Sequence, residues 1–321
     1  MRILIVKLTS MGDVLFSLPV AADLKRAYPN ATIDWVVDSR FADLPRACRL
    51  IDHVHALPFR DFGWANAAGA LGKILCTLRD IRARRYDIAV DLQGMTKSAA
   101  IVRLSGAKTR WGYRAGDMAE PLLSGVFTHR FETGRGPHPV VRYRQEIAQV
   151  SATETDGAPD FAWAFQSGQA NSPSAQASTG IATAVMFPFA SKENKQIPDD
   201  FVSSIICELK AKGFHVAIPS GSPKEQALAD RWCEQPGVTR WPQQPLGQLM
   251  PALSKAACFV GADTGLTHLA AALGVKTLAV FAKTRPQRYG PHLWSEHARS
   301  VSVHDTTAKQ QLGTFMQWVK P

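Results

Sequence analysis

The sequence has few cysteines, and they are scattered. Five cysteines in 321 residues, an odd count with no CxxC pair, argue against a disulfide framework or a cysteine zinc site and predict a reducing compartment. No uninterrupted apolar run is long enough to span a bilayer, and the chain opens on the strand-like MRILIVKL in place of a signal peptide. We therefore expect a cytoplasmic protein whose contact with a membrane, if any, is peripheral.

The motifs of several nucleotide-dependent and metal-dependent enzymes are also missing. No GxGxxG follows an opening strand and no GxxxxGK[ST] occurs, which argues against a dinucleotide-dependent oxidoreductase and against a P-loop kinase or ATPase. The GxSxG turn of α/β-hydrolases is absent. No DxD pair or HxxxH cluster suggests a bound metal, so we expect neither a metal site nor a cofactor.

Acidic residues are too few to balance the basic ones, above all in the first half. The chain carries 37 basic and 27 acidic residues, a formal net charge of +10. Residues 1–150 hold 22 basic and 14 acidic residues, a net of +8. A one-sided positive field favours an anionic partner, which could be a nucleic acid, an acidic membrane surface or a phosphorylated substrate. A generic solubilising surface is the alternative.

What the chain does contain is a regular alternation of strand-like and helix-like segments. The strand-like runs are short, rich in β-branched residues and not strictly alternating, as expected for strands buried on both faces of a parallel sheet. They form two sets: 3–8, 33–38, 53–57, 86–92 and 108–113, then 183–188, 214–219, 238–241, 257–262 and 277–282. Helical patterns cover 14–27, 201–212 and 267–273.

These two sets predict an α/β protein with two doubly wound, Rossmann-like domains that face a central cleft. A segment rich in Ser, Ala, Gln, Gly and Pro interrupts the pattern, and we interpret it as an interdomain linker. The predicted domains are residues 1–165 and 181–321, with the linker at 166–180. The last helix is a candidate to pack back on the first domain.

The loop after the first strand, LTSMGDV, could carry a catalytic group. Ligands bind at the carboxyl ends of the strands in such sheets, and Gly12 permits a tight turn just before Asp13. A carboxylate there could act as a general base. The alternative is that Asp13 only caps the following helix.

A second strand end, ACFVGADTGLTHLAAALG, has the features of an anion site. Strand 257–262 leads into Asp263, Thr264 and Gly265, where backbone N–H groups at a helix start could bind phosphate. Thr264 could add a hydroxyl donor. The alternative is that Asp263 caps the helix and that His268 is a packed, hydrogen-bonded side chain.

Two more loops follow strands of the second set. In FASKENKQIPDD, Ser191 and Lys195 would face the same cleft, where a lysine could neutralise a departing diphosphate. In PSGSPKEQ, Glu225 is placed to accept hydrogen bonds from ribose hydroxyls. A solvated basic loop and a capped turn are the respective alternatives.

Residues 69–85 predict a basic amphipathic helix. One face carries Leu71, Ile74, Leu75, Leu78 and Ile81. We expect this apolar stripe to pack against the sheet, with interfacial membrane binding as the alternative.

Three segments, in order and at compatible distances, resemble the lipopolysaccharide heptosyltransferases. They are ILIVKLTSMGDVLFSLP at 3–19, DLQGMTKSAA at 91–100 and GADTGLTHLAAALG at 261–274, and the resemblance covers nearly the whole chain. The SMGDV form, with Lys7 before it, resembles the enzymes that add the first heptose more than those that add the second.

The resemblance implies a GT-B architecture and an inverting, metal-independent glycosyltransferase without a cofactor. It implies ADP-heptose as the donor, bound by the second domain, and Kdo-lipid A as the acceptor, bound by the first. Such enzymes act in lipopolysaccharide inner-core synthesis on the cytoplasmic face of the inner membrane of Gram-negative bacteria. The anionic partners would then be the acceptor and the membrane surface, and no nucleic acid is expected.

The resemblance also assigns roles to individual residues. Asp13 matches the catalytic base, and Lys195 matches a lysine that contacts the donor phosphates. The other implied donor-site residues are Ser191, Glu225, Asp263, Thr264, Gly265 and His268. The implied acceptor-site residues are Arg60, Gln93 and Lys97.

The chain departs from the family pattern in both sites. Relatives carry paired threonines before the phosphate lysine where this chain has Ala190 and Ser191, so one hydroxyl is lost. The acceptor loop of relatives is dense in arginine, whereas this chain keeps Arg60 and then only Lys73. Ala119 stands where an arginine is expected. Further residues that could serve the acceptor are Arg110 and Arg114.

Two alternative functions stay open at this point. The first is another heptosyltransferase of the same family with a different core acceptor. The second is a basic nucleic-acid- or nucleotide-binding protein without catalysis, although the chain has no helix-turn-helix, zinc or RNP-type signal.

Overall fold

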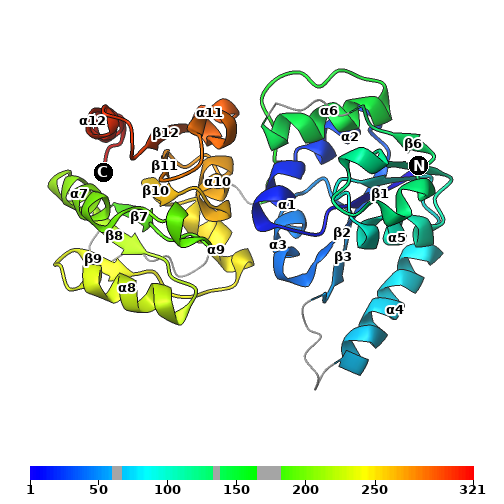
Figure 1. Cartoon of the computed structure of the whole chain (residues 1–321), viewed down its shortest axis with the longest axis horizontal. Helices are drawn as coiled ribbons and strands as arrows, with labels where there is room; N and C mark the ends of the chain where they lie inside the picture. Colours follow the sequence, from blue (N-terminus) through cyan, green and yellow to red (C-terminus); the bar gives the residue numbers. More distant parts are fainter. Residues whose placement is uncertain (60–66, 133–137, 165–181) are drawn as a thin grey trace. The chain divides into compact units, whose positions relative to one another are not determined.

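The computed structural model describes residues 1–59, 67–132, 138–164 and 182–321, and the chain divides into two compact units, Met1–Ala164 and Phe165–Pro321 (Figure 1). The predicted linker at 166–180 lies outside the described residues. No helix within those described ranges is both long and apolar enough to cross a membrane.

The first unit is built on a parallel sheet in the order β3-β2-β1-β4-β5-β6. Its strands are β1 (Arg2–Val6), β2 (Thr32–Asp38), β3 (His53–Leu57), β4 (Ile88–Asp91), β5 (Thr109–Gly112) and β6 (His129–Arg130). In the centre, Ile5 is in register with Trp35 on β2 and Val90 on β4, and all three are fully buried. Burial on both faces explains why the central strands lack polar alternation.

The helices of the first unit connect these parallel strands. They are α1 (Met11–Ser17), α2 (Val20–Ala27), α3 (Asp43–Arg46), α4 (Ala67–Ala83), α5 (Thr96–Ser105) and α6 (Pro139–Ser151), with short 3-10 turns η1 (Ser39–Phe41), η2 (Ala115–Asp117) and η3 (Pro121–Val126). The single helix predicted at 14–27 is wrong, because two helices meet at Pro19. Proline has no N–H to donate into a continuing helix, and its ring clashes with the preceding turn.

α4 forms close to the predicted position, but only its second half packs against the sheet. Ile81 is buried and Leu78 is half-buried, whereas Leu71 and Leu75 are 51% and 52% exposed. The prediction that the whole stripe packs against the sheet is therefore wrong for these two leucines. The helix continues beyond the edge of the sheet, as Figure 1 shows, so its first turns have no sheet to cover.

The second unit repeats the same topology in the order β12-β11-β10-β7-β8-β9, again all parallel. Its strands are β7 (Thr183–Phe187), β8 (His215–Ile218), β9 (Val238–Arg240), β10 (Cys258–Ala262), β11 (Thr277–Phe281) and β12 (Ala298–Ser302). Its helices are α7 (Asp199–Ala211), α8 (Pro223–Cys233), α9 (Leu246–Leu253), α10 (Gly265–Ala272), α11 (Pro286–Tyr289) and α12 (Ala308–Trp318), with η4 (Glu193–Lys195) and η5 (Pro291–Leu293).

Each sheet has an edge strand that the sequence patterns did not predict. β6 is a two-residue strand with both residues exposed, and in β12 only Ala298 and Val301 are buried. Neither has the apolar run that marks a central strand, because an edge strand is covered less completely. The last helix, α12, adds Leu312 and Phe315 to the core of the second unit, and its return to the first domain stays a prediction.

The predicted α/β class with two doubly wound parallel sheets is confirmed. In each sheet the strand order reverses between two central strands, β1 and β4 in the first unit and β7 and β10 in the second. The loops at the carboxyl ends of such a pair diverge to opposite faces and leave room for a ligand. Of the strand-end loops singled out in the sequence, those with Asp13, Lys195 and Asp263 follow β1, β7 and β10, and the loop before Glu225 follows β8.

Candidate functional site

Asp13 lies in the first turn of α1, in the loop that leaves β1. Its Oδ2 accepts hydrogen bonds from the backbone N–H of Ser10 at 3.2 Å and from the Ser10 hydroxyl at 2.8 Å. The side chain thus helps to cap the helix, as the alternative proposed, but from the third position of a capping box, because the N-cap residue is Ser10. A carboxylate has further lone pairs, so capping through Oδ2 leaves Oδ1 available for other partners.

The other oxygen of Asp13 faces a buried chain of polar groups. The Tyr143 hydroxyl, from α6, lies 3.4 Å from Oδ1. Lys7 is buried and donates to the Tyr143 oxygen at 2.7 Å and to the Leu92 carbonyl at 2.9 Å. Since the lysine donates, the single tyrosine proton is left to point toward Asp13. Tyr143 was not among the residues predicted from the sequence.

Gln93, a predicted acceptor residue, joins the loops after β1 and β4. Its Oε1 accepts from the backbone N–H groups of Leu8 at 2.9 Å and Thr9 at 3.0 Å. The backbone N–H of Gln93 donates to the buried carboxyl of Asp91 at 2.7 Å. Burial raises the pKa of Asp91 to about 6, against hydrogen bonds from Gln93, Gly94 and Ser98 that lower it. Gln93 therefore sets the path of the loop that leads to Asp13.

The other residues predicted for the acceptor site differ in their contacts and exposure. Lys97 lies in the first turn of α5 with its ammonium 5.3 Å from the centre of the Phe59 ring. Arg110 is committed to the backbone, since its guanidinium donates to the carbonyls of Val126 at 2.7 Å and Ala107 at 2.8 Å. Arg114 is exposed, 3.7 Å from Glu132. Arg60 lies outside the described residues.

In the second unit, Asp263 gathers side chains from several loops. Its Oδ2 accepts from the Lys195 ammonium at 2.9 Å and from the Thr284 hydroxyl at 2.6 Å, and its Oδ1 lies 3.4 Å from Nε2 of His268. Burial alone would raise the pKa of Asp263, but the hydrogen bonds from His268, Lys195 and Thr284 outweigh it and hold the pKa well below the ordinary value. Asp263 is therefore an anion that fixes Lys195 beside the end of β10.

The start of α10 adjoins this cluster. Thr264 is the N-cap residue, in extended conformation, and Gly265 begins the helix. The hydroxyl oxygen of Thr264 is buried, and within the described part of the chain it has no hydrogen-bond partner. The first N–H groups of a helix also have no partner inside the helix, and the helix dipole favours negative charge there. An anion bound at this point would accept hydrogen bonds from the Thr264 hydroxyl and from these N–H groups.

The other residues predicted for the donor site differ in their contacts and burial. Glu225 closes α8 through a capping box, accepting from the N–H groups of Gly221 at 2.7 Å and Ser222 at 3.0 Å. That is the capped turn which the sequence left open, and the ribose role stays a prediction. Ser191 is exposed in the loop between β7 and η4. His268 is buried against Asp263.

Taken unit by unit, the geometry offers two chemical capabilities. The first unit holds a partly accessible carboxylate, Asp13, which could take a proton from a hydroxyl. The second holds a lysine, an unsatisfied hydroxyl and a helix start, which could together stabilise negative charge on a phosphate. Lys195 and Asp263 come from the loops after β7 and β10, the strand pair at which the order of the second sheet reverses.

Comparison with known proteins places these features in a family. Residues 74–317 match the family model of glycosyltransferase family 9 (heptosyltransferase). The chain is 31% identical over 295 residues to lipopolysaccharide heptosyltransferase 1 of Escherichia coli K12, an alignment that covers 90% of each protein. The structure of E. coli heptosyltransferase WaaC with ADP is similar at a TM-score of 0.86, with 27% identity over 99% of both chains. The WaaC structure with ADP-2-deoxy-2-fluoro heptose gives 0.83, with the same identity and coverage.

Proposed function

The chain belongs to glycosyltransferase family 9, the heptosyltransferases, and has their GT-B fold; from this we propose that it transfers L-glycero-D-manno-heptose from ADP-heptose to Kdo-lipid A. The reaction is metal-independent and inverts the anomeric carbon. The observation that carries the proposal is the Lys195–Asp263 pair beside the unsatisfied Thr264 hydroxyl at the start of α10. This arrangement suits the diphosphate of a nucleotide sugar.

The donor side works by stabilising charge on the leaving group. The Lys195 ammonium has three N–H groups and gives one to Asp263, which leaves two for the phosphate oxygens of ADP. The Thr264 hydroxyl and the N–H group of Gly265 add further donors. These groups are fixed before the reaction, so they stabilise the charge that develops as the sugar–phosphate bond breaks.

The acceptor side works by removing a proton. As an acceptor hydroxyl oxygen bonds to the anomeric carbon, its proton passes to Oδ1 of Asp13, and the bond from that carbon to the diphosphate oxygen breaks with its electron pair leaving on ADP. Attack from the face opposite the leaving group inverts the configuration. Ser10 on one oxygen and Tyr143 on the other hold the carboxylate in a fixed orientation.

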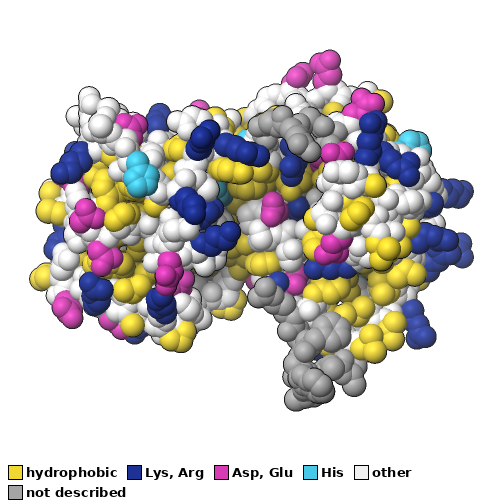
Figure 2. Space-filling model, in the orientation of Figure 1, with side chains coloured by type: hydrophobic (Ala, Val, Ile, Leu, Met, Phe, Trp, Pro, Cys, Tyr) yellow, Lys and Arg dark blue, Asp and Glu magenta, His cyan; other side chains and the backbone are white. Residues whose placement is uncertain are grey.

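We assign the protein to the cytoplasmic face of the inner membrane, as a peripheral partner of anionic lipid. The +8 charge of residues 1–150 supports this, since Kdo carboxylates, lipid A phosphates and the surrounding surface are all negative. The exposed Leu71 and Leu75 of α4 supply an apolar contact, with Lys73 exposed on the same helix. Figure 2 shows hydrophobic side chains exposed beside Lys and Arg side chains in this region.

Product analysis tests the proposal. The chain is incubated with ADP-heptose and either Kdo-lipid A or the same acceptor already bearing one heptose, and the lipid is examined by mass spectrometry. We expect one heptose to be added to the first acceptor only. Transfer to the second acceptor only would identify another heptosyltransferase. No transfer to either, together with a gel shift of nucleic acid at physiological salt, would replace the proposal with a binding protein.

A further inference from the structure

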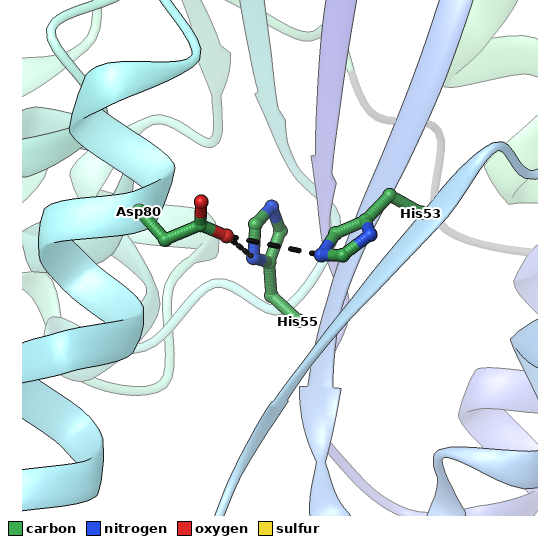
Figure 3. Close-up of side chains that lie close together, drawn as sticks. All are labelled: His53, His55 and Asp80. Carbon is green, nitrogen blue, oxygen red and sulfur yellow. Dashed lines mark ion pairs between the residues drawn. The ribbon is translucent and has the colours of Figure 1, made fainter.

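Two histidines and an aspartate converge in the first unit, on the side of β3 that packs against α4. His53 and His55 are two residues apart on β3, so their side chains point to the same face of the strand, and Asp80 approaches from α4 (Figure 3). The Oδ2 atom of Asp80 lies 3.2 Å from Nδ1 of His55 and 3.8 Å from Nε2 of His53. The three ligand atoms all lie within 4.8 Å of one another.

These separations suit a small divalent ion. A zinc ion holds imidazole nitrogens and carboxylate oxygens at 2.0–2.2 Å, so neighbouring ligand atoms in a tetrahedral site are about 3.4 Å apart. The two distances from Oδ2 of Asp80 to the histidine nitrogens, 3.2 and 3.8 Å, lie on either side of that value. Two histidines and one carboxylate leave a further coordination position for water, and the half-exposed side chains of His53 and Asp80 open the cluster to solvent there.

The hydrogen bonding of His55 fixes which of its nitrogens can bind a cation. The Tyr86 hydroxyl has one proton and donates it to Oδ2 of Asp34 at 2.6 Å. Nε2 of His55 lies 2.9 Å from the same hydroxyl oxygen, so Nε2 must carry the donating proton. Nδ1, the other ring nitrogen, lies 3.2 Å from Oδ2 of Asp80, so it is the atom of His55 placed to share a cation with that carboxylate.

We propose that His53, His55 and Asp80 form a binding site for a divalent transition metal of the zinc class. Tyr86 and Asp34 act as its outer partners: they orient the His55 ring and fix its tautomer, as outer hydrogen bonds do for metal-bound histidines. The sequence pattern did not predict this site. Its third ligand, Asp80, comes from another element, and HxH on a strand is a weak metal-binding pattern by itself.

The site is separate from the proposed transfer chemistry. His53 is the first residue of β3, at the amino end of an edge strand, whereas Asp13 follows the carboxyl end of the central strand β1. The metal would tie α4 to the sheet edge. Arg84 lies 3.6 Å from Oδ2 of Asp80 and 3.1 Å from Asp34, so the carboxylates are already partly neutralised and the ion competes with a guanidinium for one oxygen.

Zinc binding to the full chain without a histidine tag tests the proposal. Affinity is measured by competition with a chromophoric chelator, and the stoichiometry is measured by equilibrium dialysis. We expect one zinc ion per chain and a rise in the thermal midpoint on addition of zinc. His53→Ala and Asp80→Asn should each weaken binding by more than the roughly 10–100-fold that loss of an outer partner costs, and Tyr86→Phe should fall within that range.

A matched control distinguishes the site from surface histidines in general. His297 lies 3.6 Å from Glu296 and is about as exposed as His53. His297→Ala therefore removes a histidine–carboxylate pair that lies outside the proposed site. It should leave zinc affinity unchanged. Both altered ligands, His53 and Asp80, are about half-exposed, so the variants should fold, which far-ultraviolet circular dichroism checks. Absence of a one-to-one complex, or equal affinity in His53→Ala and the unaltered chain, would overturn the proposal.

Discussion

The Tyr143 hydroxyl lies 3.4 Å from Oδ1 of Asp13 while it accepts a hydrogen bond from buried Lys7 at 2.7 Å. The lysine is a strong donor, so it polarises the tyrosine hydroxyl toward the carboxylate. Tyr143 of α6 and Lys7, the residue after β1, thereby hold the group to which we assign proton transfer. Tyr143 is accordingly a positioning residue for Asp13.

Replacing Tyr143 by phenylalanine should lower kcat by roughly tenfold, the value of one ordinary hydrogen bond. The KM for ADP-heptose should change little, because the donor contacts belong to the second unit. Tyr28→Phe is the matched control, since Tyr28 donates to a backbone carbonyl, that of Val150, at 3.4 Å. A steady-state comparison of the two variants measures this. An equal loss of kcat in both variants would point to a general packing effect.

Replacing the Thr264 hydroxyl should weaken ADP binding without lowering the stability of the fold. Thr264→Val removes a buried hydroxyl that has no partner in the described residues, so stability should stay equal or rise. The affinity for ADP should fall by roughly three- to tenfold, measured by calorimetry. Thr267→Val is the contrasting variant, because that hydroxyl donates to the Ala262 carbonyl at 2.5 Å and its loss should destabilise the fold. Unchanged ADP affinity in Thr264→Val would remove Thr264 from the donor site.

Glu146 predicts a pH dependence of folding. Burial raises its pKa from 4.5 to about 7, against a hydrogen bond from Tyr113 and the charge of Arg142, which lower it. The folded chain keeps this proton between those two pH values whereas the unfolded chain loses it, so the contribution to stability is complete below pH 4.5 and is lost as the pH rises to about 7.

Urea unfolding at a series of pH values measures this effect. As the pH rises from 4.5 to about 7, ionisation of Glu146 should lower the free energy of unfolding by on the order of 1–3 kcal/mol. The Glu146→Gln variant should not show this contribution to the fall. Asp91, whose pKa burial raises to about 6, contributes a fall of the same sign that remains in the variant. An identical pH profile for the variant and the unaltered chain would contradict the assignment.

The exposed leucines of α4 predict a membrane contact. Replacing Leu71 and Leu75 by glutamine should weaken binding to anionic vesicles by roughly tenfold or more, because each buried leucine contributes about 1.5–3 kcal/mol. Co-sedimentation at low and high salt measures this, and the residual binding should be salt-sensitive. Leu104→Gln is the control, since Leu104 is 50% exposed on α5. Equal binding by the double variant and the control variant would remove α4 from the membrane-binding surface.

The sequence could predict the features that depend on local order along the chain. Apolar runs such as residues 3–6 mark the central strands, and a strand followed by a helix start places Asp13 and Asp263 at the carboxyl ends of strands. Lys195 and Asp263 are 68 positions apart and still meet, because a doubly wound sheet makes β7 and β10 neighbours. That contact follows from topology.

Contacts that depend on how elements pack could not be predicted in this way. Tyr143 lies 130 positions from Asp13, and nothing in its own segment indicates that α6 packs against α1. The same holds for Thr284, whose hydroxyl reaches Asp263 from the loop after β11. For Leu71 and Leu75, helical periodicity identifies an apolar face but does not say where the sheet beneath it ends.

The most direct test of the proposed transfer is Asp13→Asn, which keeps the size of the side chain and an oxygen that can accept from Ser10. Turnover of ADP-heptose and Kdo-lipid A, followed by mass spectrometry of the lipid, is compared with calorimetric binding of ADP. We predict that turnover falls by roughly 10²–10⁴-fold while ADP affinity stays within about twofold. Near-normal heptose transfer by the folded variant would contradict the assignment of Asp13 as the base.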